Sequence, residues 1–206
     1  MKVLLVNGSP HLKGCTYTAL MEIKGELERQ GIEADVFQVG PKPVGGCIGC
    51  GACRKLGRCF MDDQVNELTA IAGNYDGFVF GTPVHFASSA GNLTSLMDRA
   101  LYSRRDLFSF KPACAVVSCR RSGATATFDQ INKYFTISNM PIVPSQYWNN
   151  VHGNTPEEVK QDLEGLQTMR TLARNMAWLL KCIEAGKAAG IDRLSHEPKI
   201  NTNFIR

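Results

Sequence analysis

Short apolar runs alternate with amphipathic stretches along the chain. Residues 2–9 form a continuous apolar run that ends in Gly-Ser, which is typical of a strand buried on both faces. In the next segment Leu20, Ile23 and Leu27 recur at helical spacing, and Gly31 ends the pattern. The chain is therefore expected to begin with a buried strand followed by an amphipathic helix.

The same alternation continues toward the C-terminus. It predicts further strands at 34–40, 77–84, 113–119 and 141–148, and helices at 62–76, 90–102, 127–138 and 155–186. The last helix has Thr155 as its N-cap, Pro156 at its first position and Glu158 to complete a capping box. Five such alternations predict an α/β fold of the doubly wound class, with a five-stranded parallel sheet and helices on both faces.

Length and composition are those of one soluble domain. The 206 residues suit a single domain, which we assign to 1–186, followed by a tail at 187–206. The net charge of +4 comes without a long basic run, which argues against a nucleic-acid partner. No apolar stretch approaches the roughly 18 residues of a membrane span, and the N-terminus lacks the pattern of a signal peptide. We therefore expect a cytoplasmic protein whose thiols are reduced or metal-bound.

The residues after the first strand favour an anion site. Ser9, Cys15, Thr16 and Thr18 place hydroxyls and a thiol at the start of a helix, and His11 can add positive charge. A helix N-terminus with free amides binds phosphate readily. The pattern matches neither the dinucleotide-binding Rossmann motif nor the P-loop, so those two classes are disfavoured.

Two further loops follow strands of the same sheet. Pro83, Val84, His85 and Phe86 form a flat apolar surface after the strand at 77–84. Residues 118–123, after the next strand, are polar and carry two arginines, which can stabilise negative charge on an electron-poor ring. Since ligands bind at the carboxyl ends of parallel strands, we expect the three loops to form one site.

Together these loops resemble the flavodoxin-like NAD(P)H-dependent FMN reductase superfamily. "GSPHLKGCTYTAL" resembles its phosphate loop and "TPVHFASSAGNLTSLMDR" its ring-binding loop, and the similarity extends over residues 1–185. His85 replaces the tyrosine that is usual after Pro-Val. The resemblance implies bound FMN, with its phosphate on Ser9, His11, Cys15, Thr16, Tyr17 and Thr18. It places the ring near Thr82, Pro83, Val84, His85 and Phe86, with Ser118, Arg120, Arg121 and Gly123 on another side.

Four cysteines stand close together between 45 and 59, spaced C-x2-C-x2-C-x5-C. Cys47, Cys50, Cys53 and Cys59 are more compact than the two separate pairs of a structural zinc site. The run is closer to those that bind an iron–sulfur cluster. Zinc, free thiols or a redox disulfide remain as alternatives. The motif also resembles that of the iron–sulfur flavoproteins, which implies a [4Fe–4S] cluster on these four residues. The scattered Cys114 and Cys182 are expected to be small buried hydrophobic residues.

The resemblance implies an FMN-dependent oxidoreductase. It would take electrons from NAD(P)H, or from a protein donor, and pass them to a quinone, a small molecule or a protein acceptor. Its relatives form homodimers or homotetramers, and "SQYWNNVHG" is a candidate for the subunit contact. The apolar Ile200, Phe204 and Ile205 of the tail are expected to pack on a neighbouring subunit. The alternative function is a flavin-binding electron carrier or redox sensor with no substrate of its own.

Overall fold

A parallel sheet forms the centre of the molecule. We analysed a computed structural model that describes residues 1–193, 195, 197–198 and 200–202. The strands run in the order β2-β1-β3-β5-β6, and all neighbours on this path are parallel. Their bounds are β1 Lys2–Asn7, β2 Glu33–Gln38, β3 Gly77–His85, β5 Ala113–Cys119 and β6 Asn150–His152. The two-residue strand β4, Ser88–Ser89, folds back antiparallel on the end of β3.

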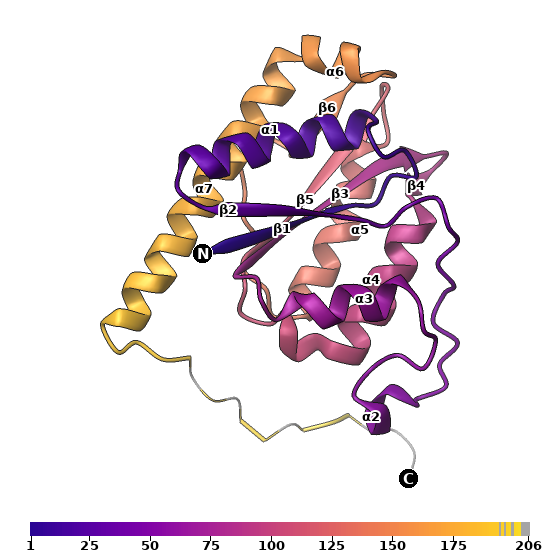
Figure 1. Cartoon of the computed structure of the whole chain (residues 1–206), viewed down its shortest axis with the longest axis vertical. Helices are drawn as coiled ribbons and strands as arrows, with labels where there is room; N and C mark the ends of the chain where they lie inside the picture. The colour runs from indigo at the N-terminus through magenta and orange to yellow at the C-terminus, as the bar shows by residue number, and fades with distance from the viewer. Residues whose placement is uncertain (194, 196, 199, 203–206) are drawn as a thin grey trace.

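Helices connect the strands, as Figure 1 shows. Their bounds are α1 Cys15–Arg29, α2 Cys53–Leu56, α3 Gln64–Ala72, α4 Gly91–Arg104, α5 Ala124–Ile137, α6 Pro156–Gln161 and α7 Leu163–Ala188, with a 3₁₀ turn at Arg105–Leu107. The predicted α/β fold with a parallel sheet is confirmed. Within the described residues, every helix is too short or too polar to span a bilayer.

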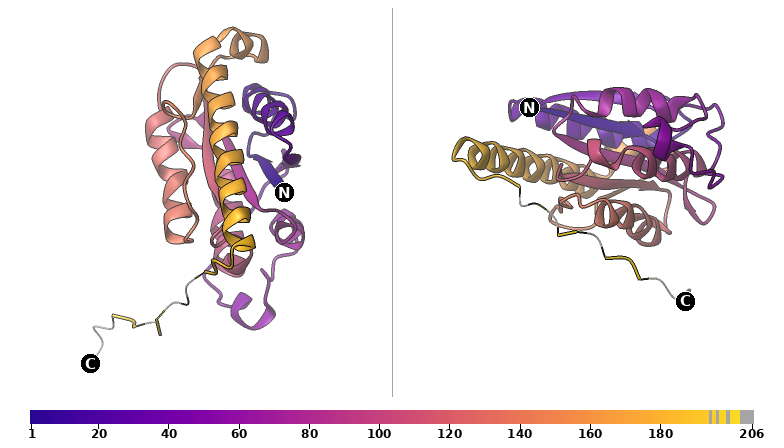
Figure 2. Two further views of the ribbon diagram at one scale, coloured as in Figure 1. Left: turned by 90° about the vertical axis from the view of Figure 1, so that its left-hand side faces the viewer. Right: turned by 90° about the horizontal axis from the view of Figure 1, so that it is seen from below.

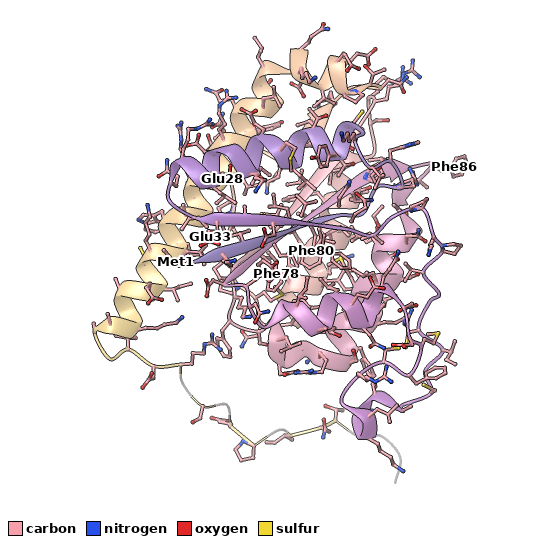
Figure 3. All side chains as sticks on the ribbon, viewed as in Figure 1. Met1, Glu28, Glu33, Phe78, Phe80 and Phe86 are labelled. Carbon is pink, nitrogen blue, oxygen red and sulfur yellow. The ribbon has the colours of Figure 1, made fainter. Side chains whose placement is uncertain are left out.

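Successive side chains of each strand build two cores, one on each face of the sheet. In β1, Leu4 and Val6 point into a core that α3, α4 and α5 cover, while Val3 and Leu5 point into a core that α1 and α7 cover. Phe78 and Phe80 of β3 lie in the first core, as their place in Figure 3 shows. Burial on both faces explains why the strands are continuous apolar runs.

The last strand lies later in the chain than predicted. Residues 141–148 were expected to form it, but they contribute an isolated bridge between Ile142 and Ala113, and the paired strand is Asn150–His152. Pro144 has no N–H for a ladder, and the Ser145 hydroxyl bonds the backbone of Tyr147 in a local turn. The segment between the bridge and β6 therefore leaves the sheet.

The predicted closing helix is in fact two helices. Thr155 caps α6 by accepting from the Glu158 N–H, as expected, but the Glu158 carboxylate accepts from the Asn154 N–H. The break comes at Asp162, whose backbone leaves the helical region and whose carboxylate caps α7 through the Gly165 N–H. Beyond α7 the tail first passes the body, where the Arg193 guanidinium lies 5.0 Å from the centroid of the Phe110 ring. The later described residues lead away from the body in the left view of Figure 2. Ile200 is fully exposed, and Phe204 and Ile205 lie outside the described residues.

Candidate functional site

Three segments meet at the carboxyl edge of β1, β3 and β5. We call residues 8–14, 82–90 and 118–123 the edge loops. The Gly8 N–H donates to the Gly81 carbonyl at 2.8 Å, and the hydroxyls of Thr16 and Ser118 lie 2.7 Å apart. The first bond joins the end of β1 to β3, and the second joins the start of α1 to the end of β5. The predicted convergence of the three loops on one edge is therefore observed.

Glycines make this close approach possible. A Cβ on Gly8 would lie 2.8 Å from both the Gly81 oxygen and the Leu93 Cβ, and one on Gly81 would lie 2.9 Å from the Thr16 Cγ2. Gly123 has a left-handed φ of 88°, and a Cβ there would lie 2.9 Å from Val84. Side chains at these positions would push the edge loops apart.

Two helices begin at this edge without side-chain caps. Gly14 is the N-cap of α1 and Gly123 the N-cap of α5, and no side chain of the described residues caps either helix. The first-turn N–H groups, with the positive end of each helix dipole, are thus available to an anion. His11, Arg120 and Arg121 are exposed beside them. This arrangement fits a phosphate group on an aromatic cofactor.

The first edge loop is braced by side chains that the sequence analysis missed. The Asn7 carboxamide accepts from the Ser9 N–H at 3.2 Å and donates to Gln38 at 2.6 Å. Gln38 in turn donates to the Ser9 carbonyl at 2.7 Å, and the Ser9 hydroxyl accepts from the His11 N–H. The sequence did contain a signal for this bracing, since Asn7 and Gln38 are polar residues at the ends of two adjacent strands.

Several residues predicted to contact the ligand are buried or half-buried beneath the surface of the site. Thr16, Thr82 and Ser118 are buried, and the Thr82 hydroxyl accepts from the Ala90 N–H and donates to the Pro83 carbonyl. Thr18 is half-buried and its hydroxyl donates to the Gly14 carbonyl. Tyr17 is also half-buried, as is Cys15, whose thiol pKa is raised by burial.

The ring-binding residues form an open surface. Pro83 and Val84 are half-buried, and His85 and Phe86 are exposed at the turn between β3 and β4. Figure 3 shows the Phe86 ring projecting from the edge of the molecule. Its φ of 57° is unusual for a bulky residue. The turn thus holds an aromatic ring in solvent at the cost of backbone strain.

The four clustered cysteines line one cavity. We call residues 45–59 the cysteine loop; it lies within the long connection between β2 and α3, with α2 apart from the other helices (Figure 1). Cys47 and Cys50 are exposed, Cys53 is half-buried and Cys59 is buried. All four border one small, open cavity, together with Phe60, Arg99 and Tyr102 from outside the loop.

Four thiols are a donor set that a four-iron cluster uses. Among the described residues, no three Cys, His, Asp or Glu side chains converge on a point that could hold a metal ion. A four-iron cluster is wider than one ion, so its thiolates surround a volume rather than a point. Left-handed glycines at 49, 51 and 57 turn the backbone around the cavity.

The cysteine loop is held mainly by side chains of α3 and α4. Asn92 accepts from the Val44 N–H at 3.1 Å, and Asn66 donates to the carbonyls of Cys59 and Met61 at 3.0 and 3.1 Å. Arg99 is buried and contacts Cys59 directly. Arg99 was not among the predicted site residues, although its place among the apolar positions of α4 was a signal of burial.

The scattered cysteines differ from one another. Cys114 is fully buried, as predicted, and desolvation raises the pKa of its thiol. The prediction that Cys182 is buried is wrong. The buried stripe of α7 runs through Leu172, Met176 and Leu180, and Cys182 lies off that stripe and is exposed.

Comparisons with known proteins agree with this arrangement. The profile of the NADPH-dependent FMN reductase family matches residues 1–155. An iron–sulfur flavoprotein of Methanocaldococcus jannaschii is 32% identical over 195 residues, which cover 89% of this chain and 100% of the relative. An iron–sulfur flavoprotein of Methanosarcina thermophila is 28% identical over 193 residues, with 91% and 99% covered.

Solved structures show the same fold at low identity. RosB, with bound 8-demethyl-8-formylriboflavin-5'-phosphate, superposes with a TM-score of 0.70 at 16% identity, over 100% of this chain and 94% of that one. An archaeal flavodoxin superposes with a TM-score of 0.60 at 14% identity, over 88% and 99%. From the profile match and the relative at 32% identity, the chain belongs to the NADPH-dependent FMN reductase family, in its iron–sulfur flavoprotein branch.

Proposed function

We propose that the protein is an FMN-dependent oxidoreductase that takes electrons from NAD(P)H or a protein donor and passes them to a quinone, another small acceptor or a protein. One observation carries the proposal: the edge loops meet at the carboxyl ends of β1, β3 and β5, joined by the Thr16–Ser118 bond, in a chain of this family. Ligands of open parallel sheets bind at such an edge.

The proposed FMN phosphate lies at the start of α1. The open N–H groups after Gly14, with Ser9 and His11 beside them, supply hydrogen-bond donors and positive potential. The ring would lie on the surface of Pro83, Val84 and Phe86. Arg120 and Arg121 are exposed at the neighbouring loop, where their charge would stabilise negative charge on the ring.

We further propose a [4Fe–4S] cluster on Cys47, Cys50, Cys53 and Cys59. Their shared cavity and the four thiol donors support it, as do the printed names of the relatives. Bound FMN would supply two-electron chemistry and the cluster one-electron transfer, so no side chain need act as a nucleophile. The chain's own residues would bind and orient these groups.

Assembly into a homodimer or homotetramer is also proposed. Tyr147 and Trp148 are more than half exposed, with ring centroids 5.8 Å apart, and Trp178 is 67% exposed on α7. Exposed aromatic residues on this scale favour a protein contact. Size-exclusion chromatography with light scattering gives the mass directly, and a monomer at micromolar concentration would contradict this point.

The test is a visible spectrum with iron and sulfide assays on protein purified without oxygen. We expect flavin bands and about four irons per chain. Anaerobic addition of NADPH or NADH should then bleach the flavin band rapidly, and a quinone should restore it. Flavin without iron would remove the cluster from the proposal. If neither NADH nor NADPH reduces the bound flavin, the result favours a carrier or sensor. If the protein does not bind FMN, the proposed function is wrong.

A further inference from the structure

Arg99 is an unusual residue for the middle of a packed helix. It lies on the buried face of α4 with Leu96 and Met97, and it is 2% exposed. A buried arginine requires partners for its charge and for five N–H groups. Its partners all lie in or next to the cysteine loop, so this buried charged side chain links α4 to that loop.

Every nitrogen of the guanidinium is hydrogen-bonded. Nη1 and Nη2 bind the two carboxylate oxygens of Asp63 at 2.7 and 3.0 Å. Nη1 also donates to the Gly45 carbonyl at 3.0 Å and Nη2 to the Met61 carbonyl at 3.2 Å. Nε and Nη2 also lie 3.3 and 3.2 Å from a single sulfur, Cys59 Sγ, and the two hydrogens of Nη2 are shared among its three acceptors.

These contacts join both ends of the cysteine loop to one side chain. Gly45 begins the loop and Cys59 ends it, and Arg99 binds both. Asp63 completes the arrangement because its carboxylate also caps α3 by accepting from the Val65 N–H. The fourth cysteine is thus fixed in the folded chain, whereas Cys47 and Cys50 are exposed.

We propose that Arg99 is a positioning residue that holds Cys59 ready as the fourth cluster ligand and raises the reduction potential of the cluster through its two bonds to the sulfur. The proposal rests on the cluster proposed above. Reduction adds negative charge to a cluster, and N–H donors and a cation at a ligating sulfur stabilise that charge. The interaction is strong here because Arg99 is shielded from water.

Asp63 modulates the effect in the opposite direction. Its carboxylate offsets part of the Arg99 charge at 2.7 Å, without itself bonding Cys59. Asp63→Asn keeps an oxygen that can cap α3 and removes the negative charge. The two substitutions therefore shift the potential in opposite directions: Arg99→Gln lowers it and Asp63→Asn raises it. A residue that only stabilises the loop would not produce this pair of signs.

The experiment uses the full-length protein with FMN, reconstituted with iron and sulfide without oxygen. The midpoint potential of the cluster is titrated in wild type, R99Q, R99K and D63N, with iron and FMN measured in each. Arg104→Gln is the matched control, since Arg104 lies on the same helix but in an exposed ion pair with Asp106. We expect R99Q to shift the reduction equilibrium at least tenfold toward the oxidised cluster, about 59 mV for one electron. R99K should lie between, and R104Q should match wild type.

A second measurement applies if R99Q holds no cluster. In cluster-free, reduced protein, iodoacetamide labelling of each cysteine is followed by peptide mass spectrometry. In wild type Cys59 should react more slowly than Cys47, and R99Q should remove that difference while the protein keeps its FMN. Retained protection of Cys59 in R99Q would overturn the proposal.

The outcomes separate this proposal from the one on which it rests. A wild-type protein that takes up no iron and sulfide would overturn both the cluster and the role of Arg99. Wild-type protein with a cluster, and unchanged potentials in R99Q and R99K, would overturn the role of Arg99 alone. Loss of FMN together with the cluster in both variants would assign Arg99 to general folding and also overturn it.

Discussion

The edge loops and the cysteine loop are held in place by different elements of the fold. The edge loops are short and follow directly from sheet strands, and they are held by backbone bonds such as Gly8 to Gly81, by glycine contacts and by side chains at the strand ends such as Asn7 and Gln38. The cysteine loop lies in a long connection outside the sheet. Side chains of α3 and α4 attach this connection to the rest of the domain, chiefly Asn66, Asn92 and Arg99.

This difference has a consequence for flexibility and for function. The edge loops continue directly from the ends of buried strands, so we expect the proposed flavin site to be less mobile than the cysteine loop. The cysteine loop depends on a few side-chain bonds, and two of its four thiols are exposed. Changes in the cysteine loop should therefore alter the metal content and leave the fold intact, whereas changes in the edge loops should alter the stability of the whole domain.

The largest expected effect tests the cysteine loop. Cys47→Ala removes an exposed thiol of the proposed cluster, so iron should fall from about four per chain to near zero with FMN and thermal stability retained. Cys182→Ala is the control, because Cys182 is also exposed but lies on α7. Equal iron content in the two variants would show that Cys47 does not bind the iron.

The second effect tests the edge loops with a matched pair of glycines. Gly8→Ala places a Cβ 2.8 Å from the Gly81 oxygen, which should destabilise the protein by about 1–3 kcal/mol and weaken FMN binding. Gly46→Ala meets no described atom within 4 Å and should change stability by less than about 0.5 kcal/mol. Urea unfolding measures both. Similar losses would mean that the two loops are equally constrained.

The same contrast explains what the sequence could predict. The strands and most helices follow from local periodicity, and the convergence of the edge loops follows from their position after parallel strands. Which atoms contact FMN stays a prediction for the edge residues. The strand expected at 141–148 was wrong because an apolar run does not reveal that Pro144 and a local turn at Ser145 remove it from the ladder.

The attachment of the cysteine loop could not be predicted in this way. The four-cysteine spacing is visible in the sequence, but the Arg99–Cys59 contact joins positions 40 residues apart. Helical periodicity marks the position of Arg99 as buried and says nothing of its partner. Cys182 shows the opposite failure: a cysteine near an apolar helix suggests burial, and only the packing of α7 shows that its face is solvent-exposed.

A third prediction concerns the packing of α1 against α7, since α1 begins directly after the first edge loop. Glu26 is buried and accepts hydrogen bonds from Arg174 of α7 at 2.7 Å, and from Arg29 and Gln30. These bonds, the one from Arg174 foremost, lower the Glu26 pKa from 4.5 to about 2. The folded pKa lies below the unfolded one, so this stabilisation is present above pH 4.5 and is lost as the pH falls toward 2.

Glu26→Gln should therefore lower stability by about 1–3 kcal/mol at pH 7. Thermal unfolding at several pH values should show the difference from wild type shrinking below pH 4.5. A difference that stays constant between pH 7 and pH 3 would mean that Glu26 acts by packing rather than by its charge.

A smaller effect is expected at the link between the start of α1 and the end of β5. Thr16→Val leaves the buried Ser118 hydroxyl without its partner at 2.7 Å and should destabilise the protein by about 1–2 kcal/mol. Ser118→Ala in the Thr16→Val background should add less than it does alone, with a coupling of about 1 kcal/mol. Additive losses in a double-mutant cycle would show that α1 and β5 are not energetically joined through this bond.

The smallest global effect should come from an attachment point of the long connection itself. Asn92 accepts from the Val44 N–H at 3.1 Å and donates to the Lys42 carbonyl at 3.0 Å, just before the cysteine loop begins. Asn92→Ala should change global stability by at most about 1 kcal/mol, because it releases a segment outside the sheet. It should nevertheless speed cleavage by proteinase K after Val44 several-fold under native conditions, because the Val44 N–H loses its partner. Thr94→Ala is the control, because the Thr94 hydroxyl bonds the Gly91 carbonyl within α4. If cleavage is unchanged in Asn92→Ala, the connection is held by other contacts, and Arg99 becomes the principal link between the cysteine loop and α4.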